Sequence, residues 1–484
     1  MKNPISLFLF FILLSVSFAA CTDDEKISTD PNLSLEFSSD TIRIDTIFTE
    51  LGSATKRLKV YNRSNYALNI ASIELMGKGQ SGFRINVDGE AGSKAENLRI
   101  LAKDSMFIFI EVTIDPLNSN SPMLITDSIR FNYNGKNQFV QLEAVGQDAI
   151  VWHGKTIEND TTLTGEKPFL IYDSLVINAG ATLNLEKNVR LHFQKGAKVL
   201  VKGSLNVKGT IEEPVYFRGA RYDNILTDVP YNNIPGQWGG IIVDSLSFNN
   251  HFENARIRGT EYGIIFNQSD PGQLKATFLN TIVINSQADG ISATDCNITA
   301  KNSLFSNAKG ATVRLIGGYY SFIHCTLANY LSWWGMGHTA GLIIGNVITL
   351  DSGSEEVRLL NQCDFFNCII ADSGFKGIQF QNKMNGNEVN ASFEHQFRNC
   401  LIQISGKDDP DNFFNNIWNK SPEFVDINYN NNYNYNFELD SISPAINIGD
   451  VTYSVSLPND LNGTPRLSDK APDAGCYEWV KKED

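Results

Sequence analysis

The hydrophobic and polar positions in the middle of the chain repeat as one short phrase. A polar residue is followed by a small residue, a few mainly apolar residues and a polar or small end, and the phrase begins at Asn280, Asn302, His324 and Asn367. The steps between these positions are 22, 22 and 43 residues. A fixed period in this range indicates one short unit that is stacked repeatedly, because each unit is too short to bury a core alone. The pattern predicts a solenoid.

The first part of the chain has a different pattern, in which short alternating runs are separated by polar turns. Such runs without helical periodicity indicate a β-sandwich, and they occur at Thr41–Ile44, Arg57–Tyr61, Met106–Ile114, Ser128–Tyr133 and Gln138–Ala144. Their layout resembles that of bacterial immunoglobulin-like domains that extend other modules. The resemblance implies a spacer or contact domain over residues 35–148, without catalytic residues.

From residue 149 the apolar runs become short and end at glycine-containing pairs. Parallel strands stacked about 4.8 Å apart form a solenoid when alternate residues point inward and glycines turn the corners, and this pattern fills Leu175–Leu185, Val189–Phe193, Val199–Thr210 and Pro214–Phe217. These stretches and Gln237–Val243 resemble right-handed parallel β-helix proteins of the pectate-lyase-like superfamily. We therefore expect an all-β chain: an immunoglobulin-like β-sandwich followed by a right-handed parallel β-helix over residues 149–415.

The leading positions of the repeated phrase predict internal ladders. Asn at the head fits an asparagine ladder at a turn, with His324 as a substituted ladder residue or, alternatively, a ligand-binding one. The next position holds Thr281, Ser303, Cys325, Cys368 and Cys400. No zinc-ligand spacing is present, so a stack of buried thiols is favoured over disulfides. We also expect a degenerate rung at Asn346–Leu350, midway between His324 and Asn367.

The end of the chain carries a series of motifs around Ser421–Asp426, Ser443–Asp450, Asp460–Arg466 and Asp473–Glu478. The series resembles the C-terminal motifs of choice-of-anchor Q surface proteins, although Asn447 and Cys476 stand where Asp and Ala are usual. A solenoid needs a polar cap, so we expect residues 416–484 to cap its open end. Arg466 is expected to clamp the cap by facing Asp460, Asp473 or Glu478.

The N-terminus reads as a targeting segment over residues 1–20, with Lys2 before an apolar run too short for a comfortable membrane span. Ser17–Cys21 resembles a bacterial lipobox, which implies that Cys21 is the lipid anchor. The acidic linker 21–34 begins with Thr22–Lys26, which resembles the surface-export signal of Bacteroidetes lipoproteins. We therefore expect a lipid-anchored, surface-exposed protein of the outer membrane. An ordinary secretory signal with a chance Cys is the alternative.

Composition narrows the classes of partner. The formal net charge is -14 and no cluster of Lys and Arg is present in the sequence, so nucleic acid is not expected as a partner. Hydrolase-type Asp pairs, an HExxH helix and phosphate-binding Gly loops are absent from the sequence. No catalytic residue, metal or cofactor is therefore assigned. The alternative is a lyase-type cluster of Asp289, Asp295, Lys301 and Arg314, and Asp408–Asp411 is a remote calcium candidate.

An aromatic patch interrupts the repeat between Tyr319 and Leu342. Aromatic faces stack on sugar rings, so Tyr320, Tyr330, Trp333 and Trp334 are the candidate ligand-binding residues. The alternative is that these rings pack the loop against the solenoid. We expect a non-catalytic binding or adhesion role at the cell surface, toward a polysaccharide or glycoprotein, with a polysaccharide lyase or hydrolase and a structural envelope protein as alternatives.

Asp followed by Ser or Thr and then an apolar or Thr residue recurs along the chain. This resembles the acceptor motif of O-glycosylation in Bacteroidetes, and a strand that begins after an Asp turn is the alternative. The motif begins at Asp40, Asp45, Asp104, Asp127, Asp160, Asp173, Asp244 and Asp440. We expect a subset of these sites to be modified.

Overall fold

A computed structural model describes residues 26–226, 228–333, 335, 337–350 and 352–481. The chain forms two compact units, one ending at Gln147 and the other beginning at Asp148. Within the described ranges, no helix has the length and apolar character needed to cross a membrane. Cys21, the expected lipid anchor, lies outside the described residues.

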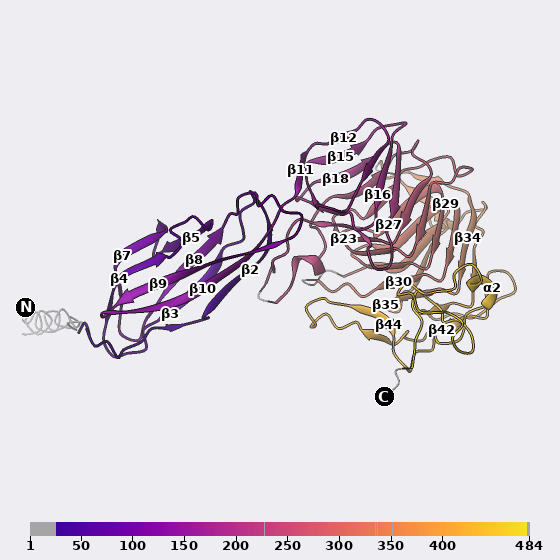
Figure 1. Cartoon of the computed structure of the whole chain (residues 1–484). Coiled ribbons are helices and arrows are strands. Elements are labelled where there is room, and N and C mark those ends of the chain that lie inside the picture. The colour runs from indigo at the N-terminus through magenta and orange to yellow at the C-terminus, as the bar shows by residue number, and fades with distance from the viewer. Residues whose placement is uncertain (1–25, 227, 334, 336, 351, 482–484) are drawn as a thin grey trace, which may run out of the picture. The chain divides into compact units, whose positions relative to one another are not determined.

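The first unit is built from antiparallel strands (Figure 1). Its strands are β1 (Glu36–Phe37), β2 (Thr41–Phe48), β3 (Lys56–Tyr61), β4 (Leu68–Leu75), β5 (Phe83–Val87), β6 (Glu90–Gly92), β7 (Lys94–Ile100), β8 (Ser105–Val112), β9 (Met123–Tyr133) and β10 (Lys136–Gln147). They form two five-stranded sheets with the orders β1-β3-β8-β5-β6 and β2-β10-β9-β4-β7. The pairing of β10 with β2 is parallel, unlike the other pairings within these two sheets.

Alternation along each strand decides which side chains fill this sandwich. In β8, Ile108 and Ile110 are buried while Phe107 and Phe109 point outward, and β3 buries Leu58 and Val60 in the same way. Buried residues of both sheets form one core. The predicted immunoglobulin-like β-sandwich is confirmed.

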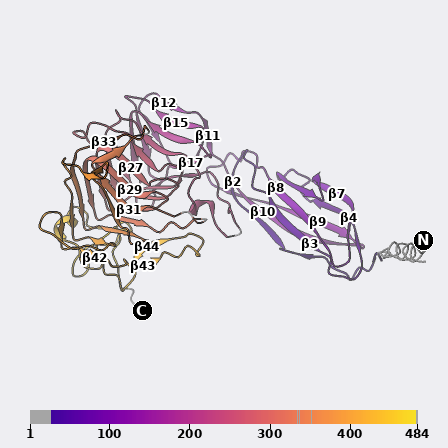
Figure 2. The same cartoon turned by 180° about the vertical axis from the view of Figure 1, so that it is seen from behind.

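The second unit is a solenoid of short parallel strands (Figure 2). They are β11 (Ile150–His153), β12 (Thr156–Ile157), β13 (Thr161–Leu163), β14 (Phe169–Tyr172), β15 (Ser174–Ile177), β16 (Thr182–Glu186), β17 (Arg190–Phe193), β18 (Lys198–Val201), β19 (Ser204–Lys208), β20 (Val215–Gly219), β21 (Gly240–Val243), β22 (Asn250–Glu253), β23 (Ala255–Thr260), β24 (Ile264–Phe266), β25 (Ala276–Leu279), β26 (Ile282–Ser286), β27 (Ile291–Lys301), β28 (Leu304–Ala308), β29 (Ala311–Ile323), β30 (Thr326–Asn329), β31 (Ala340–Gly345), β34 (Leu360–Phe366), β35 (Ile369–Asp372), β36 (Ile378–Gln381), β39 (Gln396–Arg398), β40 (Leu401–Ile402), β41 (Phe413–Phe414) and β42 (Ile417–Trp418). A short 3-10 helix, η1 (Tyr231–Asn233), follows β20.

Two long parallel sheets run the length of the solenoid. One has 11 strands in the order β11-β14-β17-β20-β23-β26-β28-β30-β35-β40-β42, and the other has 17 strands. Equivalent residues of successive rungs face each other, as Leu183 faces Leu205 and Leu185 faces Val207. The fold class predicted from the sequence, a right-handed parallel β-helix after an immunoglobulin-like sandwich, is confirmed.

The interior is filled by ladders of like side chains. Phe322, Phe365, Phe397 and Phe413 stack one above another with ring centroids 4.9, 4.9 and 5.0 Å apart. The backbone N–H of Cys325 donates to Cys368 Sγ, and that of Cys368 donates to Cys400 Sγ, each at 3.4 Å. These thiols are free and buried, as the prediction of a thiol stack required.

The heads of the repeated phrase occupy one corner of the solenoid. Asn280, Asn302, His324, Asn367 and Asn399 have φ between 50° and 53°, a left-handed conformation that Asn adopts more readily than most residues. Asn302 Nδ2 donates to Asn280 Oδ1 at 2.7 Å, and Asn367 Nδ2 lies 3.0 Å from His324 Nε2. His324 is therefore a ladder residue, as predicted.

The rung expected at Asn346–Leu350 is wrong. Val347–Thr349 forms β32, which pairs with β33 (Glu355–Val357) in a separate antiparallel hairpin. In the 11-stranded sheet β30 pairs directly with β35, so no strand is inserted there. A second small hairpin joins β37 (Lys383–Met384) to β38 (Asn387–Glu388).

The C-terminal segment, residues 421–481, contains β43 (Phe424–Asp426), β44 (Asn436–Leu439) and α2 (Val451–Ser454). Its apolar residues Phe424, Phe437 and Leu439 share a buried cluster with Leu304, Ile369 and Leu401 of the 11-stranded sheet. We expected a cap on the open end of the solenoid, but the segment lies along the outer face of this sheet. The reason is that the outward side chains there are apolar and need cover.

Arg466 ties the C-terminal segment to the solenoid. Its side chain has an exposed fraction of 0%, and its guanidinium donates to Glu478 and to Asn302 Oδ1. The clamp expected at Arg466 is thus confirmed, with Glu478 as its carboxylate partner.

Candidate functional site

Three of the four candidate aromatic residues are buried in the described structure. Tyr320, Tyr330 and Trp333 have exposed fractions of 1%, 6% and 8%, and Trp334 lies outside the described residues. Tyr320 belongs to the solenoid core, while Trp333 packs with Leu331, Val229 and Ile234. This burial supports the packing alternative, and a ligand-binding role for these residues stays a prediction.

The acidic residues of the lyase alternative are held in separate ion pairs. Asp289 Oδ2 accepts from Arg314 Nε at 2.6 Å, and Asp295 Oδ2 lies 3.2 Å from Arg358 Nε. Asp409 Oδ1, in the loop considered for calcium, accepts three backbone N–H groups of its own turn. Within the described ranges, no three His, Cys, Asp or Glu side chains are grouped so as to hold a metal ion.

A cationic surface lies on the outer face of the 11-stranded sheet, on strands β17, β20 and β23. Leu191, Phe217 and Ile257 point into the core, so their neighbours along each strand point outward. The strand register places Arg190 beside Tyr216 and Tyr216 beside Arg256 in one row, and His192 beside Arg218 in the next. Arg258 follows Arg256 on the outward side of β23.

From β26 onward the same outward rows become apolar. Ile282 lies beside Arg256, and Ile284 lies beside Arg258. Ile282 then faces Leu304 in β28. The C-terminal segment covers the apolar rows, whereas Tyr231, Asn232 and Gln237, which lie between β20 and β21, border Arg218 and Arg258.

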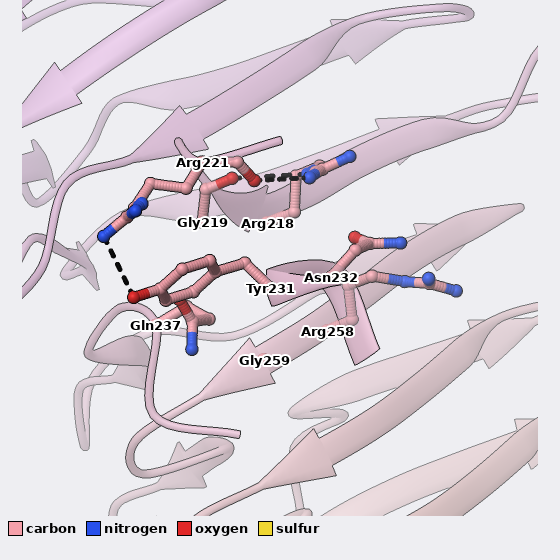
Figure 3. Close-up of a pocket in the computed structure, with 8 residues that line it drawn as sticks. All are labelled: Arg218, Gly219, Arg221, Tyr231, Asn232, Gln237, Arg258 and Gly259. Carbon is pink, nitrogen blue, oxygen red and sulfur yellow. Dashed lines mark hydrogen bonds between the residues drawn. The ribbon is translucent and has the colours of Figure 1, made fainter. Parts of the chain in front are cut away.

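Arg218, Arg221 and Arg258 surround a narrow crevice together with η1, and the crevice leaves no space for a water molecule (Figure 3). The other lining residues are Gly219, Tyr231, Asn232, Gln237 and Gly259. Tyr231 belongs to the same apolar cluster as Trp333, so Trp333 supports the loop that forms this crevice. We call it the arginine pocket.

The three guanidinium groups of the arginine pocket have different partners. Arg221 is paired with Asp223, and its Nη1 donates to the Tyr231 hydroxyl at 2.9 Å. Arg218 donates to two backbone carbonyls, of Gly219 at 3.2 Å and Arg221 at 2.8 Å, and stacks on Tyr222 at 4.1 Å. In the described structure, Arg258 has no side-chain hydrogen bond or ion pair, and its Nε is buried without a partner.

The electrostatic environment of these arginines is unfavourable for cations. Burial and then the neighbouring Arg218 lower the pKa of Arg258 to about 10. Burial also lowers the pKa of Arg218 and of Arg256. Arg221 is paired with Asp223, whereas Arg218 and Arg258 have no carboxylate partner in the described structure. Guanidinium groups without a carboxylate favour the binding of an oxyanion, since its charge would compensate theirs and its oxygens would accept their hydrogen bonds. The arginine pocket therefore has the chemistry to attract a carboxylate, sulfate or phosphate group, but in the described structure it has no space to enclose one.

Sequence reasoning missed this site. Arg218 and Arg258 are 40 positions apart, and only the rung register brings them together. The signal that was present is the alternation of basic and apolar residues in Arg190–Phe193 and Arg256–Arg258, which puts cations on the outer face of a strand whose inner face is apolar.

Comparisons with known proteins give limited information. No protein-family model and no curated protein matches the sequence. Among solved structures, a family 123 glycoside hydrolase from Clostridium perfringens has a TM-score of 0.18 and 9% identity over 25% of this chain and 30% of that one. The E. coli chaperone DraB has a TM-score of 0.17 and 13% identity over 25% and 56%.

A protein of unknown function from Porphyromonas gingivalis has a TM-score of 0.17 and 9% identity over 26% of this chain and 60% of that one. The chain thus spans less than two thirds of the length of each of these three structures. The likenesses are too weak to relate this chain to any of them.

Proposed function

We propose that the protein is a surface lipoprotein of the outer membrane that binds acidic glycans without transforming them. The observation that carries the ligand class is Arg258, an arginine without a side-chain partner that faces further arginines instead of carboxylates. Buried polar groups are normally satisfied, so a cation held without an acceptor favours a site that an anion completes. Uronate carboxylates and sulfate esters are the anions that glycans carry.

The cellular setting rests on sequence resemblance. The lipobox-like Ser17–Cys21 and the acidic stretch after it support an acyl anchor at Cys21 and display at the cell surface. The repeated rungs and the C-terminal motifs support membership of the pectate-lyase-like superfamily and of the choice-of-anchor Q type. In this proposal the sandwich is the spacer and the solenoid carries the ligand site.

Binding of defined polysaccharides to the chain from residue 22, purified without lipid, tests the ligand class. We expect polygalacturonate or heparin to bind and neutral dextran not to bind, with affinity that falls as salt rises because the contacts are ionic. Arg258→Gln and Arg218→Gln should weaken binding by about tenfold or more each.

The matched control is Arg398→Gln, which removes an arginine of β39 that lies over Phe414 on the other long sheet. Equal binding by Arg258→Gln and the unchanged protein would remove the arginine pocket from the proposal. A lyase absorbance assay on the same acidic polysaccharides completes the test, since turnover would replace a binding function with an enzymatic one.

A further inference from the structure

A serine and a histidine lie together just after the end of β35. Ser373 Oγ lies 3.3 Å from His338 Nε2, and His338 Nδ1 lies 3.2 Å from the backbone oxygen of Leu331. A carbonyl oxygen only accepts hydrogen bonds, so Nδ1 carries the proton of the neutral ring and Nε2 accepts from the Ser373 hydroxyl. A hydroxyl, a base and a group that orients the base are the parts of an activated serine nucleophile.

The turn that carries Ser373 is held in a strained conformation. Asp372, the last residue of β35, is buried, and its Oδ1 accepts the backbone N–H groups of Gly374 and Lys376 at 2.7 and 2.9 Å. Phe375 has a φ of 53°, which is rare for a bulky residue. Strain of this kind persists only where the surroundings enforce it, and it is concentrated at functional sites. The inward carboxylate thus fixes the turn, while the Ser373 side chain is exposed.

A cation and an aromatic ring lie on the same turn as the hydroxyl. The Lys376 side chain runs past Gly374, since its Cγ and Cε both lie 3.7 Å from the position that a Cβ of Gly374 would take. In the described structure Lys376 has no ion pair with a carboxylate. Phe375 has an exposed fraction of 51%. The ammonium group is therefore available to stabilise an oxyanion that forms at Ser373, and the ring offers an apolar contact to a substrate.

We propose that Ser373 and His338 hydrolyse a carboxylic ester. Lys376 stabilises the oxyanion, and Phe375 contacts the apolar part of the substrate. Two backbone N–H groups of the turn are already bound by the Asp372 carboxylate and are not free to stabilise the oxyanion, so the substrate is an ester and not the less reactive amide.

The site lies apart from the arginine pocket. In the 11-stranded sheet β35 is four strands beyond β23, in the order β23-β26-β28-β30-β35, which is about 19 Å at about 4.8 Å per strand. The failure of one proposal therefore leaves the other unaffected.

The reaction proceeds through an acyl-serine. The Ser373 oxygen forms a bond to the carbonyl carbon of the ester while its proton passes to His338 Nε2. The carbon–oxygen bond to the alcohol then breaks, and His338 gives the proton to the departing alkoxide. A water molecule next attacks the acyl carbon, gives a proton to His338 and displaces Ser373, which takes the proton back. Ester and water are thus converted to acid and alcohol.

The probe is p-nitrophenyl acetate, added to the chain from residue 22. Absorbance measures the release of p-nitrophenol, and mass spectrometry of peptides from acid-quenched protein locates the acetyl group. We expect acetyl on Ser373, and both Ser373→Ala and His338→Gln should lower the rate above that of buffer at least about hundredfold. Phe375→Asn, which tolerates the positive φ, should raise KM more than it lowers kcat. Lys376→Gln should lower kcat and leave Ser373 as the acetylated residue.

The matched control is Ser454→Ala. It removes another Ser–His pair, in which Ser454 Oγ lies 2.8 Å from His324 Nε2 but both residues are buried, so it should change neither the rate nor the site of acetylation. Hydrolysis by Ser373→Ala at the rate of the unchanged protein overturns the proposal. Acetyl found on His338 or on lysines, with none on Ser373, also overturns it, because the imidazole or amine would then react alone.

Discussion

Replacing Arg258 by Met should stabilise the solenoid while removing its ligand. Arg258 is a cation without a partner beside Arg218 and Arg256, so its charge costs free energy in the folded state. Methionine keeps much of the apolar stem that packs on the sheet and removes the charge. A residue held for binding is expected to behave in this way, because functional groups often reduce stability.

The structure bounds the gain in the free energy of unfolding. The pKa of Arg258 falls from 12.5 to about 10 on folding, which corresponds to about 3 kcal/mol at roughly 1.4 kcal/mol for each pH unit. This is an upper limit because part of the side chain remains in contact with solvent. After the lost packing of the longer arginine stem is deducted, Arg258→Met should raise the free energy of unfolding by about 1–2 kcal/mol.

Arg466 supplies the comparison, since it is also buried but its two terminal nitrogens donate to Glu478 and Asn302, although its Nε lacks a hydrogen-bond partner as that of Arg258 does. Arg466→Met leaves both acceptors buried without their donor, so it should destabilise the docked C-terminal segment by about 3 kcal/mol. The two substitutions are chemically identical and should have opposite signs.

Urea unfolding combined with hydrogen exchange of residues 255–260 measures the Arg258 effect, and exchange of residues 459–479 measures the Arg466 effect. Heparin or polygalacturonate should raise the unfolding midpoint of the unchanged protein and leave that of Arg258→Met unaltered. If Arg258→Met destabilises the solenoid as Arg466→Met destabilises the C-terminal segment, Arg258 is a structural residue and the reasoning fails.

Three further predictions concern the C-terminal segment and its surface. Burial raises the pKa of Glu478 from 4.5 to about 8 and that of Asp473 from 3.8 to about 6. The folded state then binds more protons than the unfolded chain, so the urea midpoint of unfolding should decrease as the pH rises from about 5 to about 8.5. The variant Glu478→Gln should remove most of this decrease. A chain ending at Lys420 should aggregate because it exposes Ile282, Leu304, Ile369 and Leu401. If sedimentation shows a monomer and urea unfolding shows unchanged stability, the C-terminal segment does not cover these residues. Ser441 precedes Ile442, which has an exposed fraction of 73%, so natively expressed protein should carry a glycan mass that Ser441→Ala loses; an intact mass equal to the bare chain would end this idea.

The repeat made much of the solenoid predictable. A side chain that recurs every 22 residues meets its own kind on the next rung, so the asparagine corner followed from the period. The thiol stack followed from position in the repeated phrase, because Cys325, Cys368 and Cys400 each come directly after its first residue although they are 43 and 32 positions apart. The false rung at Asn346–Leu350 shows the limit of this reasoning. Val347–Thr349 has the composition of a strand, and composition does not distinguish a solenoid rung from a local hairpin; the direct pairing of β30 with β35 does.

Other features depended on surfaces, which the sequence pattern does not place. The position of the C-terminal segment follows from a ladder of outward apolar residues that includes Ile282 and Leu304. A strand that is apolar on both faces shows in the sequence that its outer face is covered, but it does not show which segment covers that face. The sequence favoured Trp333 as a ligand contact because an exposed aromatic loop and a packed one have the same sequence pattern. The structure shows Trp333 beneath the loop that forms the arginine pocket.

The lack of a carboxylate beside Arg258 carries the main argument for a ligand on the solenoid. A chain with 54 acidic residues and 40 basic ones has carboxylates available to neutralise a buried arginine, and it places them beside Arg314 and Arg358. Beside Arg258 it places Arg218 and Arg256. Arg221 of the arginine pocket is also compensated, by Asp223, so among the arginines that line this pocket the carboxylate is missing for Arg218 and Arg258. That arrangement is expected when the compensating anion is brought by a ligand.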